Sequence, residues 1–205
     1  MDEREARRAL VETCRMLYDR GLTVSAGGNM SVRTADGVLI TPSGRNKGLL
    51  SPDDLVKVSM DGTVVSGGRP SIETGFHLAL YRSNPGTNAV IHCHPLNCIA
   101  ITVRGERLRC NLTPEGALLL GRVAEVPYVT PGTQELVDAV AEHADAKAML
   151  MVRHGALTQG ATLEEAFDRM EELEFQARLQ MLCGDAEDLP DAELRRLGVL
   201  RWRCW

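Results

Sequence analysis

Helix-like and strand-like segments alternate along the whole chain, and this alternation restricts the possible folds more than any other feature. Amphipathic segments predict helices at residues 2–20, 71–83, 114–121, 133–144 and 162–183. Short apolar or β-branched runs predict strands at residues 29–33, 38–40, 55–59, 88–94 and 148–152. Each segment has an apolar face that must be buried against another layer. We therefore expect an α/β fold with helices over a sheet, while the pattern leaves the order and direction of the strands open.

The length and composition fit one domain, residues 1–205, and limit the kinds of partner that it can bind. The net charge is −5, which argues against nucleic acid, because phosphate backbones select clustered lysines and arginines. No stretch approaches the roughly 20 apolar residues of a membrane span, and the first residues contain no apolar signal segment. The six cysteines form no CxxC pair, which is typical of reduced thiols. We expect a cytoplasmic protein with no membrane partner.

The sequence His92-Cys93-His94 stands at the end of an apolar strand and is followed by Pro95. Side chains at positions i and i+2 of a strand point to the same face, about 7 Å apart along it. The two imidazoles can therefore converge on one cation, while Cys93 points to the other face. Two structural histidines are the alternative explanation of this pair.

His154 adds a third candidate ligand, because it also follows an apolar strand and precedes Gly155. Three histidines leave a fourth coordination position open, which is typical of catalytic rather than structural zinc. Imidazole ligands suit Zn²⁺, and Co²⁺, Mn²⁺ and Fe²⁺ are alternatives at such a site.

Glu73 begins a predicted helix, and His77 follows it one turn later on the same face. On spacing alone, the simpler explanation of a glutamate at this position is a helix-capping carboxylate, which the positive end of the helix dipole favours. For His77, a local hydrogen bond is the simpler interpretation, and pairing with Glu73 as a ligand is the alternative.

Two glycine-containing loops and a helix start are candidate anion sites. The loops are Gly27-Gly28-Asn29 and Ser43-Gly44, and Ser71 is expected to be the N-cap of the helix that contains Glu73. Such loops expose backbone N–H groups, and a helix N-terminus adds a positive dipole end. Together with a metal site, they indicate a phosphorylated substrate.

Five segments, read in order, resemble the class II aldolase/adducin-head family, in particular its L-fuculose-1-phosphate aldolase branch. They span most of the chain, from about residue 5 to about residue 180, and they are residues 27–33, 40–44, 69–73, 88–94 and 153–155. The resemblance implies a three-layer α/β/α fold with a largely antiparallel, mixed sheet. It also implies a C4 homotetramer with active sites between subunits.

The resemblance further implies roles for individual residues. His92, His94 and His154 would bind zinc, and Glu73 would be the acid/base beside it. The substrate phosphate would be held by Gly28, Asn29, Ser43, Gly44 and Ser71. The reaction implied is cleavage of a ketose 1-phosphate of the fuculose, deoxyribulose or methylthioribulose type. A metal-stabilised enediolate would lead to dihydroxyacetone phosphate, with an aldehyde as the second product.

Three positions depart from the aldolase pattern. Ile72 stands where the family usually has a second serine, and residues 111–113 contain no tyrosine. The C-terminal tail ends Trp202-Arg203-Cys204-Trp205 instead of supplying a tyrosine. We expect this tail to cover the site or an interface between subunits.

Three alternatives belong to the same fold. Methylthioribulose-1-phosphate dehydratases have cysteine at the position of Glu73 and use a later glutamate, near which Glu115 stands as a possible second acid/base. Pentulose-phosphate epimerases have aspartate at the position of Glu73. Non-catalytic adducin heads lack the metal histidines, all three of which are present here.

Overall fold

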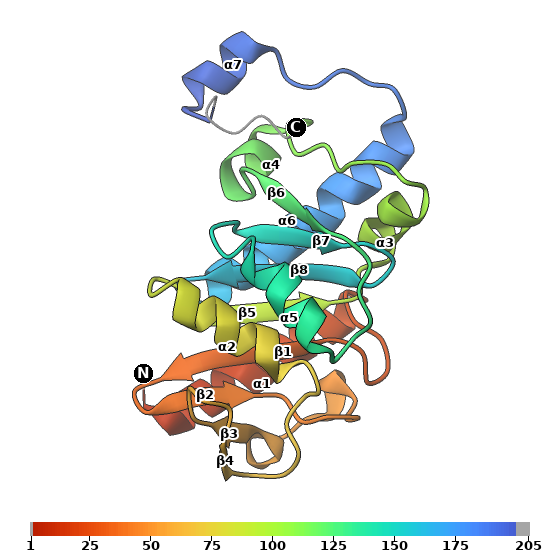
Figure 1. Cartoon of the computed structure of the whole chain (residues 1–205). Helices are drawn as coiled ribbons and strands as arrows, with labels where there is room; N and C mark the ends of the chain where they lie inside the picture. Colours follow the sequence, from red (N-terminus) through yellow and green to blue (C-terminus); the bar gives the residue numbers. More distant parts are fainter. Residues whose placement is uncertain (1, 200–205) are drawn as a thin grey trace.

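The computed structural model describes residues 2–199 and contains an eight-stranded mixed sheet with helices on both faces (Figure 1). The strand order is β4-β3-β2-β1-β5-β8-β7-β6, and every neighbouring pair is antiparallel except β6 and β7. This arrangement confirms the expected three-layer, largely antiparallel fold. The strands are β1 (Asn29–Thr34), β2 (Gly37–Ile40), β3 (Val56–Val58), β4 (Val64–Ser66), β5 (Ala89–Cys93), β6 (Val123–Val126), β7 (Ala148–Met151) and β8 (Gly155–Gly160).

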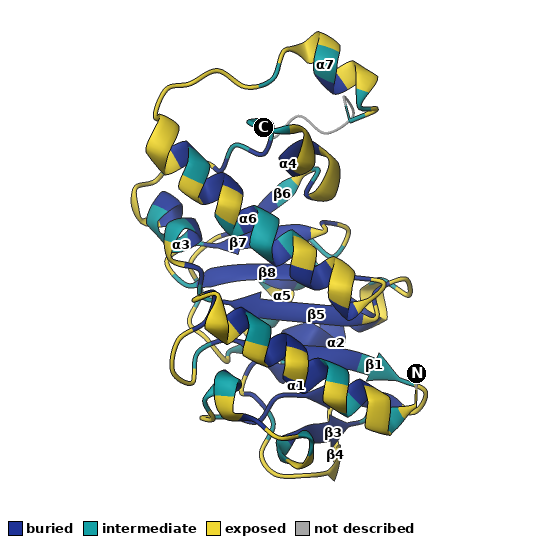
Figure 2. Cartoon of the chain, turned by 180° about the vertical axis from the view of Figure 1, so that it is seen from behind, coloured by how far each residue is buried: buried dark blue, intermediate teal, exposed yellow. Residues whose placement is uncertain are grey.

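The longer helices form the two outer layers, with α1, α3 and α6 on one face of the sheet and α2 and α5 on the other (Figures 1 and 2). Two short 3₁₀ helices, η1 and η2, pack against α1. The helices are α1 (Glu3–Asp19), η1 (Lys47–Leu49), η2 (Pro52–Asp54), α2 (Thr74–Ser83), α3 (Leu96–Val103), α4 (Pro114–Leu119), α5 (Gln134–Ala141), α6 (Leu163–Cys183) and α7 (Asp191–Arg196).

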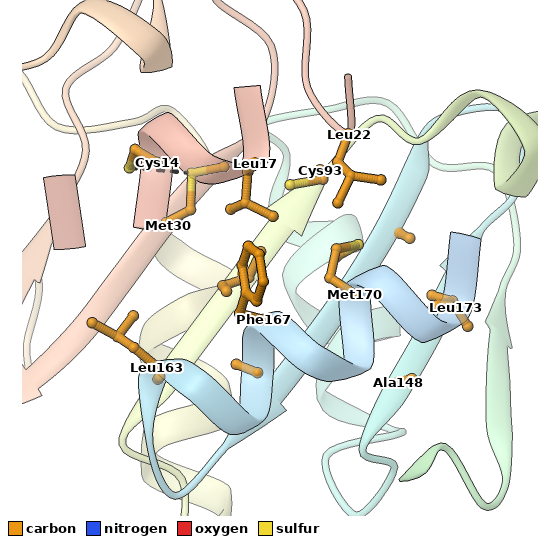
Figure 3. Packing of buried hydrophobic residues seen from close by; sticks show 14 of the residues in the cluster. Cys14, Leu17, Leu22, Met30, Cys93, Ala148, Leu163, Phe167, Met170 and Leu173 are labelled. Atoms are coloured by element: carbon orange, nitrogen blue, oxygen red, sulfur yellow. Dashed lines mark hydrogen bonds between the residues drawn. The ribbon is translucent and has the colours of Figure 1, made fainter. Parts of the chain in front are cut away.

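The larger core lies between the sheet and the layer that contains α1 and α6. Leu17 of α1 and Phe167 and Met170 of α6 pack there against Met30 of β1 and Cys93 of β5 (Figure 3). Each such side chain contributes about 1.5–3 kcal/mol when it is fully buried. This core fixes the position of β5 in the middle of the sheet.

The second core lies on the opposite face, under α2 and α5. Phe76 and Leu80 of α2 and Leu136 of α5 pack there against Val90 of β5. Strand β5 therefore alternates between the two cores, since Ala89, Ile91 and Cys93 belong to the larger one. The side of β5 that carries His92 consequently faces α2.

Helix starts follow the capping residues in most of the predicted cases. At α1, for which no cap was predicted, the Asp2 side chain accepts a hydrogen bond from the N–H of Glu5, and the Glu5 side chain accepts one from the N–H of Asp2. Thr133 and Thr162 cap α5 and α6 as expected. The exception is α2, which begins at Thr74 and not at residue 71, with Glu73 in the N-cap position.

The sequence patterns missed the two 3₁₀ helices, η1 and η2, and five further elements: β4, α3, β6, β8 and α7. In each of them the composition opposes the structure or the segment is very short. Strand β8 reads Gly-Ala-Leu-Thr-Gln-Gly, with few β-favouring residues, while helix α3 contains two isoleucines, a valine and a threonine. Strand β8 forms because it pairs with β5 and β7, and helix α3 forms because it packs on α6.

Two further expectations concern the C-terminal tail and the absence of a membrane-spanning segment. The tail Trp202–Trp205 lies outside the described residues. Within residues 2–199, none of the helices combines the length and the apolar character needed to cross a bilayer.

Candidate active site

The end of β5 places His92 and His94 together. His92 is fully buried and meets the ring of Phe76 edge-on, with ring centroids 5.7 Å apart. The backbone N–H of His94 donates to Leu22 O at 3.1 Å, which holds the chain just beyond the strand. Cys93 points into the larger core, as the strand alternation predicts.

His154 comes from the tight turn between β7 and β8, where Arg153 adopts a positive φ of 57°. Gly155 allows this turn to approach β5 closely, since a Cβ on it would lie 2.9 Å from His94 Cδ2 and 3.1 Å from His92 Cε1. Any larger residue would separate the turn from the two histidines.

The three rings form a compact set with the geometry of a metal site. The Nε2 atoms of His92 and His94 are 3.2 Å apart, and one ligand atom from each histidine lies within 4.8 Å of the others. Two nitrogens bound tetrahedrally to one zinc ion at about 2.0–2.1 Å would be about 3.3 Å apart. His92 Nδ1 donates to Ala156 O at 2.9 Å, which leaves the Nε2 lone pair available. The donor set therefore fits a divalent metal ion.

The electrostatic surroundings keep these histidines neutral, which is the state that a metal requires. Burial lowers the pKa of His92 well below its usual value, and the neighbouring His94 and His154 lower it further. Burial also lowers the pKa of His94 to about 4. The pKa of His154 is lowered by burial against the opposing effect of Glu73.

Glu73 lies beside the triad and does not cap α2 through its side chain. Its Oε1 is 3.4 Å from His154 Nε2, and its Oε2 is 3.5 Å from His92 Nε2. Asn29 Nδ2 donates to Oε2 at 2.7 Å, while Oε1 is buried and accepts no hydrogen bond from the described residues. Glu73 thus occupies the N-cap position of α2, but its side chain forms no capping hydrogen bond and points to the histidines instead, so the interpretation as a capping carboxylate is wrong.

Ser71 and His77 also differ from the simplest expectations. Ser71 precedes the helix by three residues, and its Oγ accepts from the N–H of Glu73 at 3.2 Å. It therefore orders the turn before α2 and is not the N-cap. His77 does not bond to Glu73 directly and instead contacts Asn29 and Ser31 of β1.

The candidate phosphate residues converge on one cavity of about 330 Å³. Gly28 and Gly44 adopt positive φ angles of 69° and 68°, a conformation that turns backbone N–H groups toward a common point. The cavity lining includes Gly28, Asn29, Ser43, Gly44 and Ser71 together with Glu73, His94 and His154. Segments that are far apart in the sequence thus meet as expected.

Lys47 lines the same cavity and was not identified from the sequence. Its side chain is only 2% exposed, and its ammonium donates to Ala26 O at 2.9 Å and to Arg45 O at 2.8 Å. It thereby joins the two glycine loops and places a positive charge behind them. A lysine in a polar loop normally indicates a solvated side chain, and its closeness to Ser43-Gly44 was the only available signal.

Ile72 and Glu115 have contrasting positions. Ile72 lines the cavity and is half exposed, in place of the hydroxyl that the family usually presents. Glu115 is exposed on the first turn of α4, near Glu172 of α6, and is not part of the cavity lining. Within one chain, nothing supports Glu115 as a second acid/base.

The fold and the site together define an α/β domain in which three histidines that could hold a metal ion lie beside a buried carboxylate. Residues 8–181 match the family described as Class II Aldolase and Adducin N-terminal domain. The chain belongs to this family and is a metal-dependent lyase.

Three relatives show the range within the family. A 3-oxo-tetronate 4-phosphate decarboxylase from Escherichia coli strain K12 is 38% identical over 190 residues, 89% of each chain. An L-fuculose phosphate aldolase from Methanococcus vannielii is 36% identical over 169 residues, 82% of this chain and 92% of the relative. The crystal structure of YgbL from Escherichia coli superposes with a TM-score of 0.90 at 35% identity, covering 95% of this chain and 98% of YgbL.

Proposed function

We propose that this enzyme acts on a short phosphorylated sugar with a ketone, breaks the bond between the carbon next to the ketone and the carbon beyond it, and releases dihydroxyacetone phosphate. The observation that carries the proposal is the free oxygen of Glu73. Oε1 is buried and without a hydrogen bond among the described residues, on a carboxylate that lines the cavity beside the three histidines. A carboxylate in this position suits proton transfer to a substrate carbon.

The metal that we propose is zinc, held by His92, His94 and His154. When bound, it would act as a Lewis acid toward the oxygens of the substrate ketone. Cobalt, manganese and iron suit the same ligands.

The phosphate end of the cavity is proposed to bind the substrate phosphate through four groups. The glycine loops at Gly28 and Gly44 offer backbone N–H groups, and Ser43 and Ser71 offer hydroxyls. Lys47 contributes its charge from behind the loops. Ile72 supplies no hydroxyl, so the site depends more strongly on the remaining donors.

The proton step follows from the position of Glu73. Breaking the carbon–carbon bond leaves an electron pair on the carbon next to the ketone, which spreads onto oxygen as an enediolate. Glu73 takes up a proton from solvent on Oε1 and delivers it to that carbon, which returns Glu73 to the carboxylate and gives dihydroxyacetone phosphate. In the reverse direction the same oxygen removes this proton.

Two substrate types give this same three-carbon fragment. A ketose 1-phosphate loses an aldehyde, which is the reaction expected from the sequence. A 3-oxo-tetronate 4-phosphate, the substrate named for the decarboxylase relative, loses its C1 carboxylate as CO₂. In both substrates, the phosphate, the ketone and the carbon that takes up the proton occupy equivalent positions.

The sequence lacks the tyrosine expected near the leaving part of an aldolase substrate, and this favours decarboxylation. Loss of an aldehyde requires a base that removes a hydroxyl proton from the leaving part, whereas CO₂ leaves without one. The chain has tyrosines only at positions 18, 81 and 128, and none in residues 111–113. The decarboxylase relative also matches a larger share of this chain than the fuculose phosphate aldolase does, 89% against 82%.

One assay tests both reactions. Zinc-loaded enzyme is incubated separately with 3-oxo-tetronate 4-phosphate and with a panel of ketose 1-phosphates. A coupled NADH assay detects dihydroxyacetone phosphate, and CO₂ and aldehyde are measured separately. We expect Glu73→Gln to retain the metal and to lose turnover. Loaded wild-type enzyme that releases dihydroxyacetone phosphate from neither substrate type would refute the proposal.

We also propose a cytoplasmic homotetramer with active sites between subunits. Support comes from apolar side chains that remain exposed at the cavity or near it in the sequence: Ile72 lines the cavity and is 56% exposed, and Val24 and Leu96, two residues from the lining residues Ala26 and His94, are 62% and 74% exposed. The six cysteines form no CxxC pair, which is typical of reduced thiols in a reducing compartment. Light scattering coupled to size exclusion tests the assembly, and a monomer at micromolar concentration would contradict it.

A further inference from the structure

A line of buried polar side chains runs between β1 and α2 and ends at Glu73. Asn29 and Ser31 alternate along β1, while Glu73, His77 and Tyr81 follow one another at four-residue spacing along α2. None of the five is more than 6% exposed. Buried polar groups are costly unless they are hydrogen-bonded, and each of these five is bonded to another member of the line.

The hydrogen bonds in this line all point toward Glu73. The carboxylate only accepts, so the Asn29 amide must present Nδ2, which donates to Glu73 Oε2 at 2.7 Å. Asn29 Oδ1 then faces His77 Nε2 at 2.5 Å and must accept its proton.

The rest of the line follows from the state of His77. Burial lowers the pKa of His77 to about 3, so the ring is neutral and carries one proton. With that proton on Nε2, Nδ1 accepts from the Ser31 hydroxyl at 2.7 Å. Ser31 Oγ in turn accepts from the Tyr81 hydroxyl at 2.7 Å. Only one arrangement of protons satisfies all four contacts.

This arrangement gives His77 a specific task. Glu73 decides which end of the amide faces it, but a single hydrogen bond leaves the amide free to tilt about that bond. The second bond, from His77 Nε2–H to Asn29 Oδ1, fixes the plane of the amide. Without it, Oδ1 is left buried without a donor, and the amide shifts. The Glu73 carboxylate would then no longer be held firmly with Oε1 free.

We propose that His77 is a positioning residue of the lyase reaction, which fixes the Asn29 amide and through it the orientation of the Glu73 carboxylate. The inference rests on the proposed function of Glu73. The hydrogen bonds of His77 go to Ser31 and Asn29 and not to a metal ligand or to Glu73, so its effect on the site passes through Asn29, which lines the cavity.

Two substitutions at His77 and one control separate positioning from stability. His77→Phe keeps a flat ring that can stack on Phe76, as His77 does at 4.8 Å, but removes the donor. His77→Gln restores both a donor and an acceptor. The control Thr87→Val removes a buried hydrogen bond to Gln159 at the opposite end of β5.

We expect His77→Phe to lower kcat on the order of 100-fold with unchanged metal affinity, because small misplacements of a reacting group have effects of this size. His77→Gln should recover most of the loss. Thr87→Val should lower Tm without lowering kcat. Wild-type kcat in His77→Phe, or an equal loss in Thr87→Val, overturns the proposal.

A second readout does not depend on activity. Nitrogen-15 NMR of the zinc-loaded protein should show the Nε2–H form of His77, and the side-chain amide of Asn29 should exchange its protons at least about 10-fold faster in His77→Phe. An Nδ1–H ring, or unchanged exchange, overturns the inference even in an active enzyme. If the wild type turns over no substrate while both NMR results hold, the proposed function fails and the orienting role of His77 stands.

Discussion

The contact between Gly27 and His94 gives the most direct test of the metal site. Gly27 packs its backbone against the imidazole, and a Cβ on it would lie 2.7 Å from His94 Nδ1 and 3.1 Å from Val24 O. Ordinary van der Waals contacts begin at 3.4 Å. In Gly27→Ala, either the ring or the loop must therefore move by about 0.7 Å.

The displacement is large on the scale of metal coordination. Metal–nitrogen distances in proteins vary by only about 0.2 Å, so a shift of this size takes His94 Nε2 out of bonding distance or distorts the site. Changes in the groups that orient a ligand typically cost 10–100-fold in metal affinity. We expect Gly27→Ala to bind zinc about 10–100-fold more weakly, or about 1.4–2.7 kcal/mol.

The assay is a competition with a chromogenic chelator, supported by the metal content after dialysis. Gly68→Ala is the matched control, because its Cβ would meet no atom within 4 Å. The thermal unfolding of the metal-free variants should be similar, which separates a local effect from misfolding. A Gly27→Ala affinity equal to that of Gly68→Ala would refute the argument that Gly27 seats His94.

Three further predictions follow. Lys47→Met should raise KM for a phosphorylated substrate about 10-fold, because it removes a charged donor, and should not affect an analogue without phosphate; equal effects on both ligands would contradict this. The metal-free protein should lose stability as pH falls below about 6.5, since the folded pKa of His77 is lowered to about 3 and the unfolded state takes up the proton first. The loss from His77 should reach about 2 kcal/mol at pH 5 in urea unfolding, and His77→Gln should show a shallower dependence. Met170→Ala, in the larger core, should cost about 2–5 kcal/mol of stability while the folded protein retains its metal affinity; weaker binding would mean that the core also shapes the site.

The sequence was most informative where one local rule decides the structure. Strand alternation placed His92 and His94 on one face and Cys93 on the other, and threonine caps placed the starts of α5 and α6. It failed at β8, where glycine and glutamine oppose strand formation and the neighbouring strands decide.

In the candidate site too, some features follow from local sequence patterns and others depend on tertiary packing. The glycine loops and histidines could be predicted because their residue types are unusual at those positions. The burial of Lys47 depends on how η1 packs against α1 and the loop at Ala26, and the bond between Asn29 and His77 depends on how α2 lies across β1. No local pattern encodes either arrangement. A signal was nevertheless present, since polar residues at two-residue spacing in the strand match polar residues at four-residue spacing in the helix.

The polar side of β1 also has a consequence for strand pairing. Met30 and Val32 enter the larger core, while Asn29 and Ser31 point to the polar side chains of α2. If β1 slipped by one residue, every side chain would exchange faces. The asparagine and the serine would then enter an apolar core, and a methionine and a valine would meet the polar face of α2. The groups that orient the active carboxylate thus also specify the register of a central strand, so replacing them with apolar residues would risk misaligning the sheet as well as inactivating the enzyme.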